Sequence, residues 1–447
     1  MFTQVKSYIV SNKLIIGISS GGFLFSLLIG ITVANLSNPI IFSLVFLGLI
    51  SFAYLIYKDI NIGIGIFIGS ILFEYSVIPI LSVNASISKM IGILILGLCI
   101  LKLIIERKNL ILNDRKSTLI GLFFIWCSFS LLYVSNIELG IARIITLFQL
   151  ILAYIILIKT INDSKALTKI LLVVTIIGIV ISVISMITVF SSPHILAQSS
   201  AAVQRYEGSG KDPNMFAQNF LALLPFCLFF YLTRSKTFIL AIMAFIFVLL
   251  CTFSRGAFVG LIVTLLSSAI IILKRRKHSL VFLLATFPIL VASIIFLNKN
   301  RAVERRLVTH GSTQVRIELA KVALDMGINN FITGVGIGNF IEHSDKYGNK
   351  VHYRRESHNG FLDVFATLGL PGFIIFLYII YLCFKDFWLG MKHTNLSSNE
   401  LKNLIQLVFI SFISFLITGL FLGLTFVKMF WVLVAFSSIC KKIAVNE

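Results

Sequence analysis

Runs of about 20 consecutive apolar residues recur from one end of this 447-residue sequence to the other. A helix of that length satisfies its backbone hydrogen bonds internally and crosses a bilayer core that is about 30 Å thick. The pattern therefore predicts an all-α polytopic membrane protein with about 12–14 transmembrane helices. The expected spans cover residues 14–34, 39–57, 60–81, 88–105, 117–135, 140–159, 168–190, 214–233, 237–253, 256–273, 279–297, 359–384, 403–422 and 425–440.

Charge supports this class and predicts an orientation. Only 13% of residues are charged, about half the fraction usual in soluble domains, yet the net charge is +20. In a soluble chain such a charge would suggest nucleic acid, but basic residues of membrane proteins collect on cytoplasmic loops. If the N-terminus is cytoplasmic, 22 of the 38 Lys and Arg residues lie at inner loops and helix ends, and six lie at short outer loops. We therefore expect both termini inside, no nucleic-acid partner, and contact with membrane lipids.

Cysteine and histidine spacing indicates no metal site. All six cysteines fall within or at the ends of apolar runs, and none has a partner at metal-ligand or disulfide-framework spacing. The histidines do not pair at i, i+4 on one helix, as a zinc-binding helix requires. The basic N-terminus before an apolar run is interpreted as a retained first helix, because no small-residue cleavage site follows it.

One long polar segment, residues 298–360, interrupts the apolar pattern and is expected on the outer side. Its ten basic and six acidic residues give it a net charge of about +4, which suits an anionic ligand. Helical periodicity runs from Thr313 to Asn329, with Ser312 or Thr313 as the N-cap. That boundary places Arg316 in the first turn, where a helix favours anions.

Arginines from three separate outer segments are candidates for a cationic, phosphate-binding cluster. Arg205 lies in a loop, Arg255 in a tight hairpin and Arg316 in the long segment, with Arg143 and Lys211 as secondary candidates. Guanidinium groups stay charged and donate paired hydrogen bonds, which suits phosphate oxygens. The alternative interpretation is that each arginine separately contacts lipid headgroups at the membrane surface.

His358 is the candidate general base. It precedes the next apolar span, and histidine titrates near neutral pH, so it can accept a proton from a hydroxyl group. The alternative is a histidine that only forms hydrogen bonds at a helix N-terminus. His310, His343 and His352 share the segment, and spacing does not exclude them.

Two motifs resemble nucleotide-binding loops but lack their context. Gly334-x-Gly336-x-Gly338 has no preceding strand, and a dinucleotide loop requires one. Glu207-Gly208-Ser209-Gly210-Lys211 has Arg205 where a P-loop needs glycine, and Asp212 where it needs Ser or Thr. Neither motif supports nucleotide binding.

Over residues 200–380 the chain resembles the O-antigen ligase and O-antigen polymerase superfamily of bacterial envelope proteins. The resemblance rests on four ordered elements: Arg205-x-x-Gly208 with Asp212-Pro213-Asn214-x-Phe216-Ala217; Phe253-Ser254-Arg255-Gly256-Ala257; Arg316 followed by Gly334-x-Gly336-x-Gly338-Asn339-Phe340; and His358-Asn359-Gly360-Phe361-Leu362 followed by Leu368-Gly369-Leu370-x-Gly372. Two positions depart from the common pattern. Ser357 replaces a frequent proline, and Ala323 replaces a frequent aromatic residue.

The resemblance implies a membrane glycosyltransferase with a fold similar to the C-type lipid-carrier glycosyltransferases. It implies an undecaprenyl-diphosphate-linked glycan donor, a lipid or glycan acceptor, no metal or other cofactor, and action on the outer face of the bacterial inner membrane in surface polysaccharide or lipopolysaccharide synthesis. Arg205, Arg255 and Arg316 would then neutralise the leaving diphosphate, and His358 would deprotonate the acceptor.

The same resemblance divides the chain into N-terminal helices at 1–190, a ligase-like region at 191–384 containing the outer loop 298–358, and C-terminal helices at 385–447. A ligase passes a finished polymer to a lipid or protein, whereas a polymerase passes the growing chain to the next lipid-linked unit. These motifs serve both. A flippase for lipid-linked glycans is a third interpretation, but transporter charges usually lie at mid-membrane.

Overall fold

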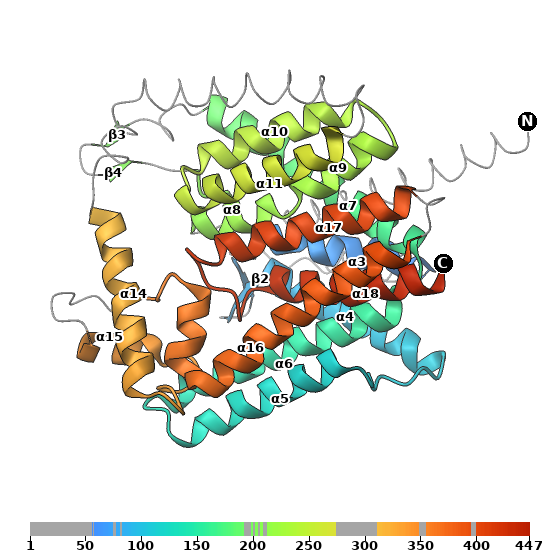
Figure 1. The fold of residues 1–447 in the computed structure, drawn as a ribbon. Helices are drawn as coiled ribbons and strands as arrows, with labels where there is room; N and C mark the ends of the chain where they lie inside the picture. Colours follow the sequence, from blue (N-terminus) through green and yellow to red (C-terminus); the bar gives the residue numbers. More distant parts are fainter. Residues whose placement is uncertain are drawn as a thin grey trace, which may run out of the picture.

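The computed structural model describes residues 56, 58–74, 77–80, 83–191, 198–199, 202–203, 206–208, 212–273, 311–347, 355–394 and 399–447. Within them the chain is a helical bundle with two short antiparallel hairpins, β1–β2 and β3–β4 (Figure 1). The first half contains α3 (Ile60–Ser70), η1 (Ile71–Phe73), β1 (Val77–Ile80), β2 (Val83–Ser86), α4 (Ile87–Ile105), α5 (Arg115–Phe129), η2 (Ser130–Leu132), α6 (Ile137–Thr160), α7 (Ser164–Ser191), β3 (Gln198–Ser199) and β4 (Ala202–Val203). The second half contains α8 (Pro213–Leu221), α9 (Leu224–Thr233), α10 (Phe238–Cys251), α11 (Arg255–Leu273), α14 (Gly311–Asn329), α15 (Phe340–Tyr347), α16 (Gly360–His393), α17 (Asn399–Thr418) and α18 (Lys428–Asn446).

The predicted all-α polytopic class is confirmed. Eight helices among the described residues are long and apolar enough to cross a membrane, and three shorter apolar helices cover 60–73, 238–251 and 255–271. The spans expected at 14–34, 39–57 and 279–297 lie outside the described residues, except for Ile56. The span expected at 214–233 is confirmed as one candidate span, Pro213–Thr233, in which the turn at Ala222 and Leu223 separates α8 from α9 while both residues keep helical dihedrals.

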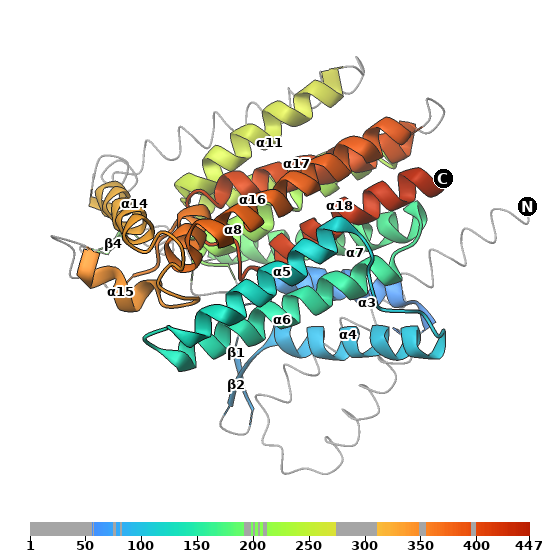
Figure 2. The ribbon, with the colours of Figure 1, turned by 60° about the horizontal axis from the view of Figure 1, so that its bottom comes forward.

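The helices have their loops at two ends. We call the end that carries residues 311–347 and 355–359 the loop end; α14 and α15 lie there, whereas the C-terminus lies at the opposite end (Figures 1 and 2). At the loop end, Lys428 Nζ contacts Glu74 Oε1 at 3.2 Å. At the opposite end, Lys116 and Lys441 contact the two carboxylate oxygens of Asp386 at 2.6 and 3.0 Å. Polar contacts thus join helices at both ends.

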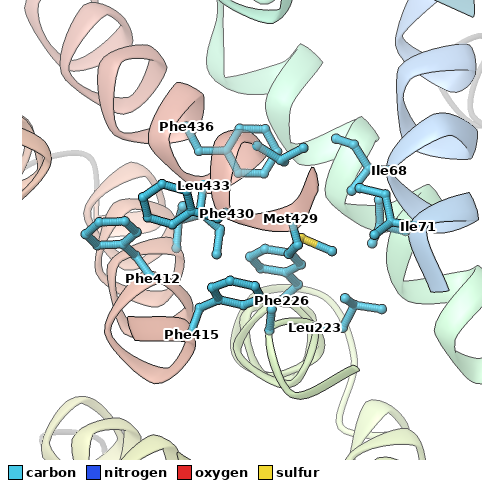
Figure 3. Close-up of a cluster of buried hydrophobic side chains, with 14 of the residues drawn as sticks. Ile68, Ile71, Leu223, Phe226, Phe412, Phe415, Met429, Phe430, Leu433 and Phe436 are labelled. Carbon is cyan, nitrogen blue, oxygen red and sulfur yellow. The ribbon is translucent and has the colours of Figure 1, made fainter. Parts of the chain in front are cut away.

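Aromatic and aliphatic side chains fill the centre of the bundle. Figure 3 shows Phe226 of α9 beside Phe415 of α17 and Met429 of α18, and all three side chains are buried. The core joins helices from both halves of the chain, including Ile68 of α3. It therefore fixes the helices that carry the loop-end segments.

Candidate functional site

His358 is positioned by its two neighbours. Its backbone is left-handed, with φ 49°, a conformation that costs a residue other than glycine about 1–2 kcal/mol. The Asn359 side chain caps α16 by accepting hydrogen bonds from Phe361 N (3.0 Å) and Leu362 N (3.1 Å). Ser357 is buried, and its Oγ lies 3.3 Å from Asp363 Oδ1. Because both neighbours are held, the half-buried His358 ring has a defined place at the start of α16.

One connecting turn, residues 419–427 between α17 and α18, contacts both the start of α16 next to His358 and the Arg255 hairpin. Gly360 N donates to Gly419 O at 2.8 Å, and a Cβ on Gly360 would lie 2.7 Å from Leu424 Cγ. On the other side, a Cβ on Gly256 would lie 3.0 Å from Phe421 Cβ. The two sequence motifs, 104 residues apart, therefore rest on one turn.

Electrostatic interactions link four segments at this place. Burial, and then the positive charge of Arg255, lower the pKa of Arg316, while Asp212 opposes the shift. Burial, and then the positive charge of Arg316, lower the pKa of His358, while Glu356 and Asp212 oppose it. Arg316 remains charged at neutral pH, whereas His358 is held in its neutral form. The structure thus brings Arg255, Arg316 and His358 together with the Asp212 carboxylate.

Asp212 has a structural role that the sequence predicted and an electrostatic one that it did not. It caps α8, with its Oδ1 accepting from Asn214 N at 2.7 Å, and Pro213 follows at the first helical position, as expected. Its charge also acts on both Arg316 and His358. The local sequence identified Asp212 only as an N-cap. Its electrostatic effect on Arg316 and His358 could not be predicted, because no local pattern shows which residues distant in sequence lie near a helix cap.

The other predicted residues are placed differently. Arg143 Nη2 lies 3.8 Å from Glu356 Oε1, and the guanidinium carbon lies 4.9 Å from the centre of the Phe426 ring. Arg143 therefore contacts the segment before His358 instead of Arg316. Arg205 and Lys211 lie outside the described residues, as do His310 and His352.

The helix that carries Arg316 begins earlier than predicted. The apolar face of α14 is as expected, with Leu319, Val322, Ala323 and Met326 buried. The helix starts at Gly311, so 312 and 313 lie inside it and Arg316 lies in the second turn. The dipole of a helix acts mainly within its first turn. The expected contribution of the helix N-terminus to anion binding at Arg316 is therefore wrong.

The glycine turn after α14 is a structural joint. Helix α16 bends at Gly369, with φ 65°. The carbonyl of Thr367 loses its intrahelical donor because Pro371 has no N–H, and the carbonyl of Ala366 loses its donor because Leu370 N donates to Phe331 O instead. Val335 N and Gly336 N replace those donors, at 3.0 and 2.8 Å. Sequence reasoning excluded a nucleotide-binding role for Gly334-x-Gly336-x-Gly338 but did not identify this joint.

Asn339 attaches the same turn to the hairpin between α5 and α6. Its Oδ1 accepts from Asn136 N at 2.7 Å and from Ser135 Oγ at 3.0 Å, and its Nδ2 donates to Asn136 O at 3.2 Å. His343 Nε2 also lies 3.0 Å from Ser135 Oγ. These contacts attach the part of the long segment that precedes His358 in the sequence to the hairpin between α5 and α6.

The fold and these contacts define a polytopic membrane protein with a basic cluster and a neutral histidine assembled at one end of its bundle. Residues 238–377 match the model of the O-antigen ligase family. No curated protein sequence matches the chain significantly. Residues 238–377 are therefore similar to the O-antigen ligase family, as the ordered motifs predicted, and this similarity supports an enzymatic role.

Proposed function

We propose that this protein transfers a glycan from an undecaprenyl diphosphate carrier to an acceptor hydroxyl, as an O-antigen ligase does, on the outer face of the bacterial inner membrane. The observation that carries the proposal is the grouping of Arg255 and Arg316 with His358 inside the matched family region. Two guanidinium groups supply positive charge where a diphosphate leaving group develops negative charge. The neutral imidazole supplies a proton acceptor.

The reaction assigned to these groups conserves atoms and charge. The acceptor oxygen attacks the anomeric carbon of the donor and loses its proton to His358. The bond between that carbon and the diphosphate oxygen breaks, and the electron pair leaves on the diphosphate, beside Arg255 and Arg316. Burial and the charge of Arg316 lower the pKa of His358, which keeps the base unprotonated at neutral pH. Metal ions have no assigned role in this proposal.

The first test compares three variants in a deletion strain. Arg316→Ala removes one charge next to the leaving group, and we expect transfer to fall by about 10²–10³-fold. His358→Ala removes the base and should lower it by about 10²–10⁴-fold. Lys321→Ala is the matched control, since this exposed residue lies on the same helix as Arg316. Membrane levels of each variant are measured alongside envelope glycans on gels.

The glycan products distinguish the alternatives within the superfamily. Long chains stranded on the lipid carrier in the Arg316→Ala strain would identify a ligase. Single units on the final acceptor, without long chains, would identify the polymerase alternative. Full rescue by both Arg316→Ala and His358→Ala would contradict the transferase and return the flippase interpretation, because a transporter does not need either group for a chemical step.

A further inference from the structure

Helix α8 carries two buried amide side chains that the mechanism above does not use. Gln218 is 1% exposed and Asn219 is 2% exposed. Among the described side chains, Gln218 Nε2, Gln218 Oε1 and Asn219 Oδ1 are buried without any hydrogen-bond partner. A buried polar group left in this state costs about 1–3 kcal/mol. Two adjacent residues with this cost, in the membrane part of a helix, require an explanation.

Both amides belong to the helix that begins at the basic cluster. Asp212, which acts on Arg316 and His358, caps α8, and Gln218 lies about 9 Å further along the helix axis. Phe216 and Phe220 stack at 5.3 Å, and Phe220 packs against Phe245 of α10. Gln218 is turned by about 200° from Phe216 and Asn219 by about 300°, so Gln218 lies on the face opposite Phe216 and Asn219 lies about 100° around the helix from Gln218.

A third unpartnered group lies in the turn beneath His358. Thr425 is 4% exposed, and its Oγ1 has no hydrogen-bond partner among the described residues. Its neighbour Leu424 contacts Gly360, next to the His358–Asn359 pair. Unpartnered polar atoms therefore occur on two elements that adjoin the basic cluster.

The unpartnered atoms include both hydrogen-bond donors and hydrogen-bond acceptors, and this restricts the chemical class of a ligand that could pair with them. Gln218 Oε1 and Asn219 Oδ1 are acceptors and need a partner that donates, whereas Gln218 Nε2 needs one that accepts. Ionised phosphate has no hydrogens to donate, and a lipid chain has no polar atoms. A sugar hydroxyl both donates and accepts. The amides therefore match a group that both donates and accepts, such as a sugar hydroxyl or a water, and not a phosphate or an acyl chain. Only a saccharide ligand makes the affinity for a glycan-bearing carrier depend on these amides, which is what the test below measures.

We propose that Gln218 and Asn219, with Thr425, bind hydroxyl groups of the sugar adjoining the diphosphate of the lipid-linked donor. This inference rests on the proposed function, since it assigns the sugar subsite of that same donor. Asp212, Arg255 and Arg316 would lie at the diphosphate, and the α8 amides would lie beyond it. The subsite would select which glycan-bearing carriers are used.

The test uses purified full-length protein and two probes, the glycan-bearing carrier extracted from the deletion strain and undecaprenyl diphosphate without sugar. Affinity for each is measured from the thermal shift that it produces. Gln218→Met and Asn219→Leu replace the amides by apolar side chains of similar size. We expect each variant to raise the Tm of the ligand-free protein, because an unpartnered buried polar group is removed. We expect affinity for the glycan-bearing carrier to fall about tenfold, with affinity for the sugar-free carrier retained.

Asn403→Leu is the matched control, because Asn403 is 7% exposed, its Nδ2 is also unpartnered among the described residues, and it lies towards the opposite end of α17. It should raise the Tm and leave both affinities unchanged. A lower ligand-free Tm in both α8 variants, or unchanged affinity for the glycan-bearing carrier, would overturn the subsite. Failure of the wild type to bind either carrier would instead refute the proposed function. Gln218→Met alone decides the result if Asn219→Leu does not fold.

Discussion

At the scale of single residues, the charged groups around His358 shift its pKa in opposite directions, and substitutions can separate these effects. Arg316 favours the neutral imidazole, and Asp212 and Glu356 favour the protonated one. His358 itself is fixed by the Asn359 cap and by the buried Ser357. Changing a neighbouring charge should therefore alter protonation without displacing the ring.

Asp212→Asn tests this separation, because asparagine caps a helix about as well as aspartate but carries no charge. The Asp212 carboxylate raises the pKa of His358, so its loss lowers that pKa further. If neutral His358 is the base, activity should persist to lower pH than in the wild type. The acid limb of the kcat/KM profile measures this, and Glu356→Gln should move it in the same direction. An acid limb displaced to higher pH would contradict His358 as the base.

At the scale of elements, the bend in α16 and the glycine turn form one unit. The turn supplies the hydrogen bonds that the bent helix lacks, and Leu370 N donates to Phe331 O at 2.7 Å. Trp126 Nε1 of α5 donates to Leu368 O at 2.9 Å, so a third helix joins the bend. The position of α14, and with it Arg316, depends on this joint.

Gly334→Ala should break the joint. Gly334 has φ 67°, and an added Cβ would lie 2.3 Å from the Thr367 carbonyl carbon, a backbone atom that cannot rotate away. We expect a loss of about 2–4 kcal/mol in stability and weaker protection of 311–347 from proteolysis. Gly97→Ala is the control, since a Cβ there meets nothing within 4 Å. Equal proteolysis of Gly334→Ala and wild type would disprove the role of the joint.

Sequence reasoning predicted the helices better than it predicted their breaks and contacts. Apolar periodicity identifies α14 and most spans because burial repeats along each helix. It did not show the local turn at Ala222 and Leu223 that separates α8 from α9 within one span, where the adjacent residues are apolar. It also did not show that the charge of Arg255 acts on Arg316, because an electrostatic interaction between residues 61 positions apart leaves no local pattern. The grouping of Arg255 with Arg316 was predicted only as a possible cationic cluster and as an implication of the family resemblance.

At the scale of the whole molecule, ionic contacts join helices that are distant in sequence. Lys116 of α5 is 2% exposed and pairs with Asp386 of α16, which also contacts Lys441 of α18. Lys116 Nζ also donates to Ser437 Oγ at 2.6 Å. A buried charge is costly without its partner, so this group ties three helices at the opposite end.

Asp386→Leu alone should therefore destabilise the protein by about 3–5 kcal/mol, because Lys116 remains buried and unpaired. The double variant Lys116→Met with Asp386→Leu should recover most of that loss. Thermal unfolding of both proteins in the same detergent gives the comparison. A double variant no more stable than Asp386→Leu would show that the pair is not the source of the effect.

The orientation proposed for the bundle is also a whole-molecule property. All six native cysteines are buried, so added cysteines report with low background. Lys321→Cys at the loop end should react in intact cells with a thiol reagent that cannot cross the inner membrane. Lys165→Cys at the opposite end, also exposed, should react only after the membrane is permeabilised. The reverse pattern would invert the proposed topology.

The joint between the glycine turn and α16 also sets an order of synthesis. The glycine turn forms hydrogen bonds with two parts of the chain. Tyr133 and Asn136 are synthesised about 200 residues before the turn, and the carbonyls of Ala366 and Thr367 are synthesised about 30 residues after it. The glycine turn is therefore made before its second anchor exists. Arg316 and His358 can take their places only once the bend has been made, so the proposed site would be completed late in translation, after most of the bundle's helices have been synthesised.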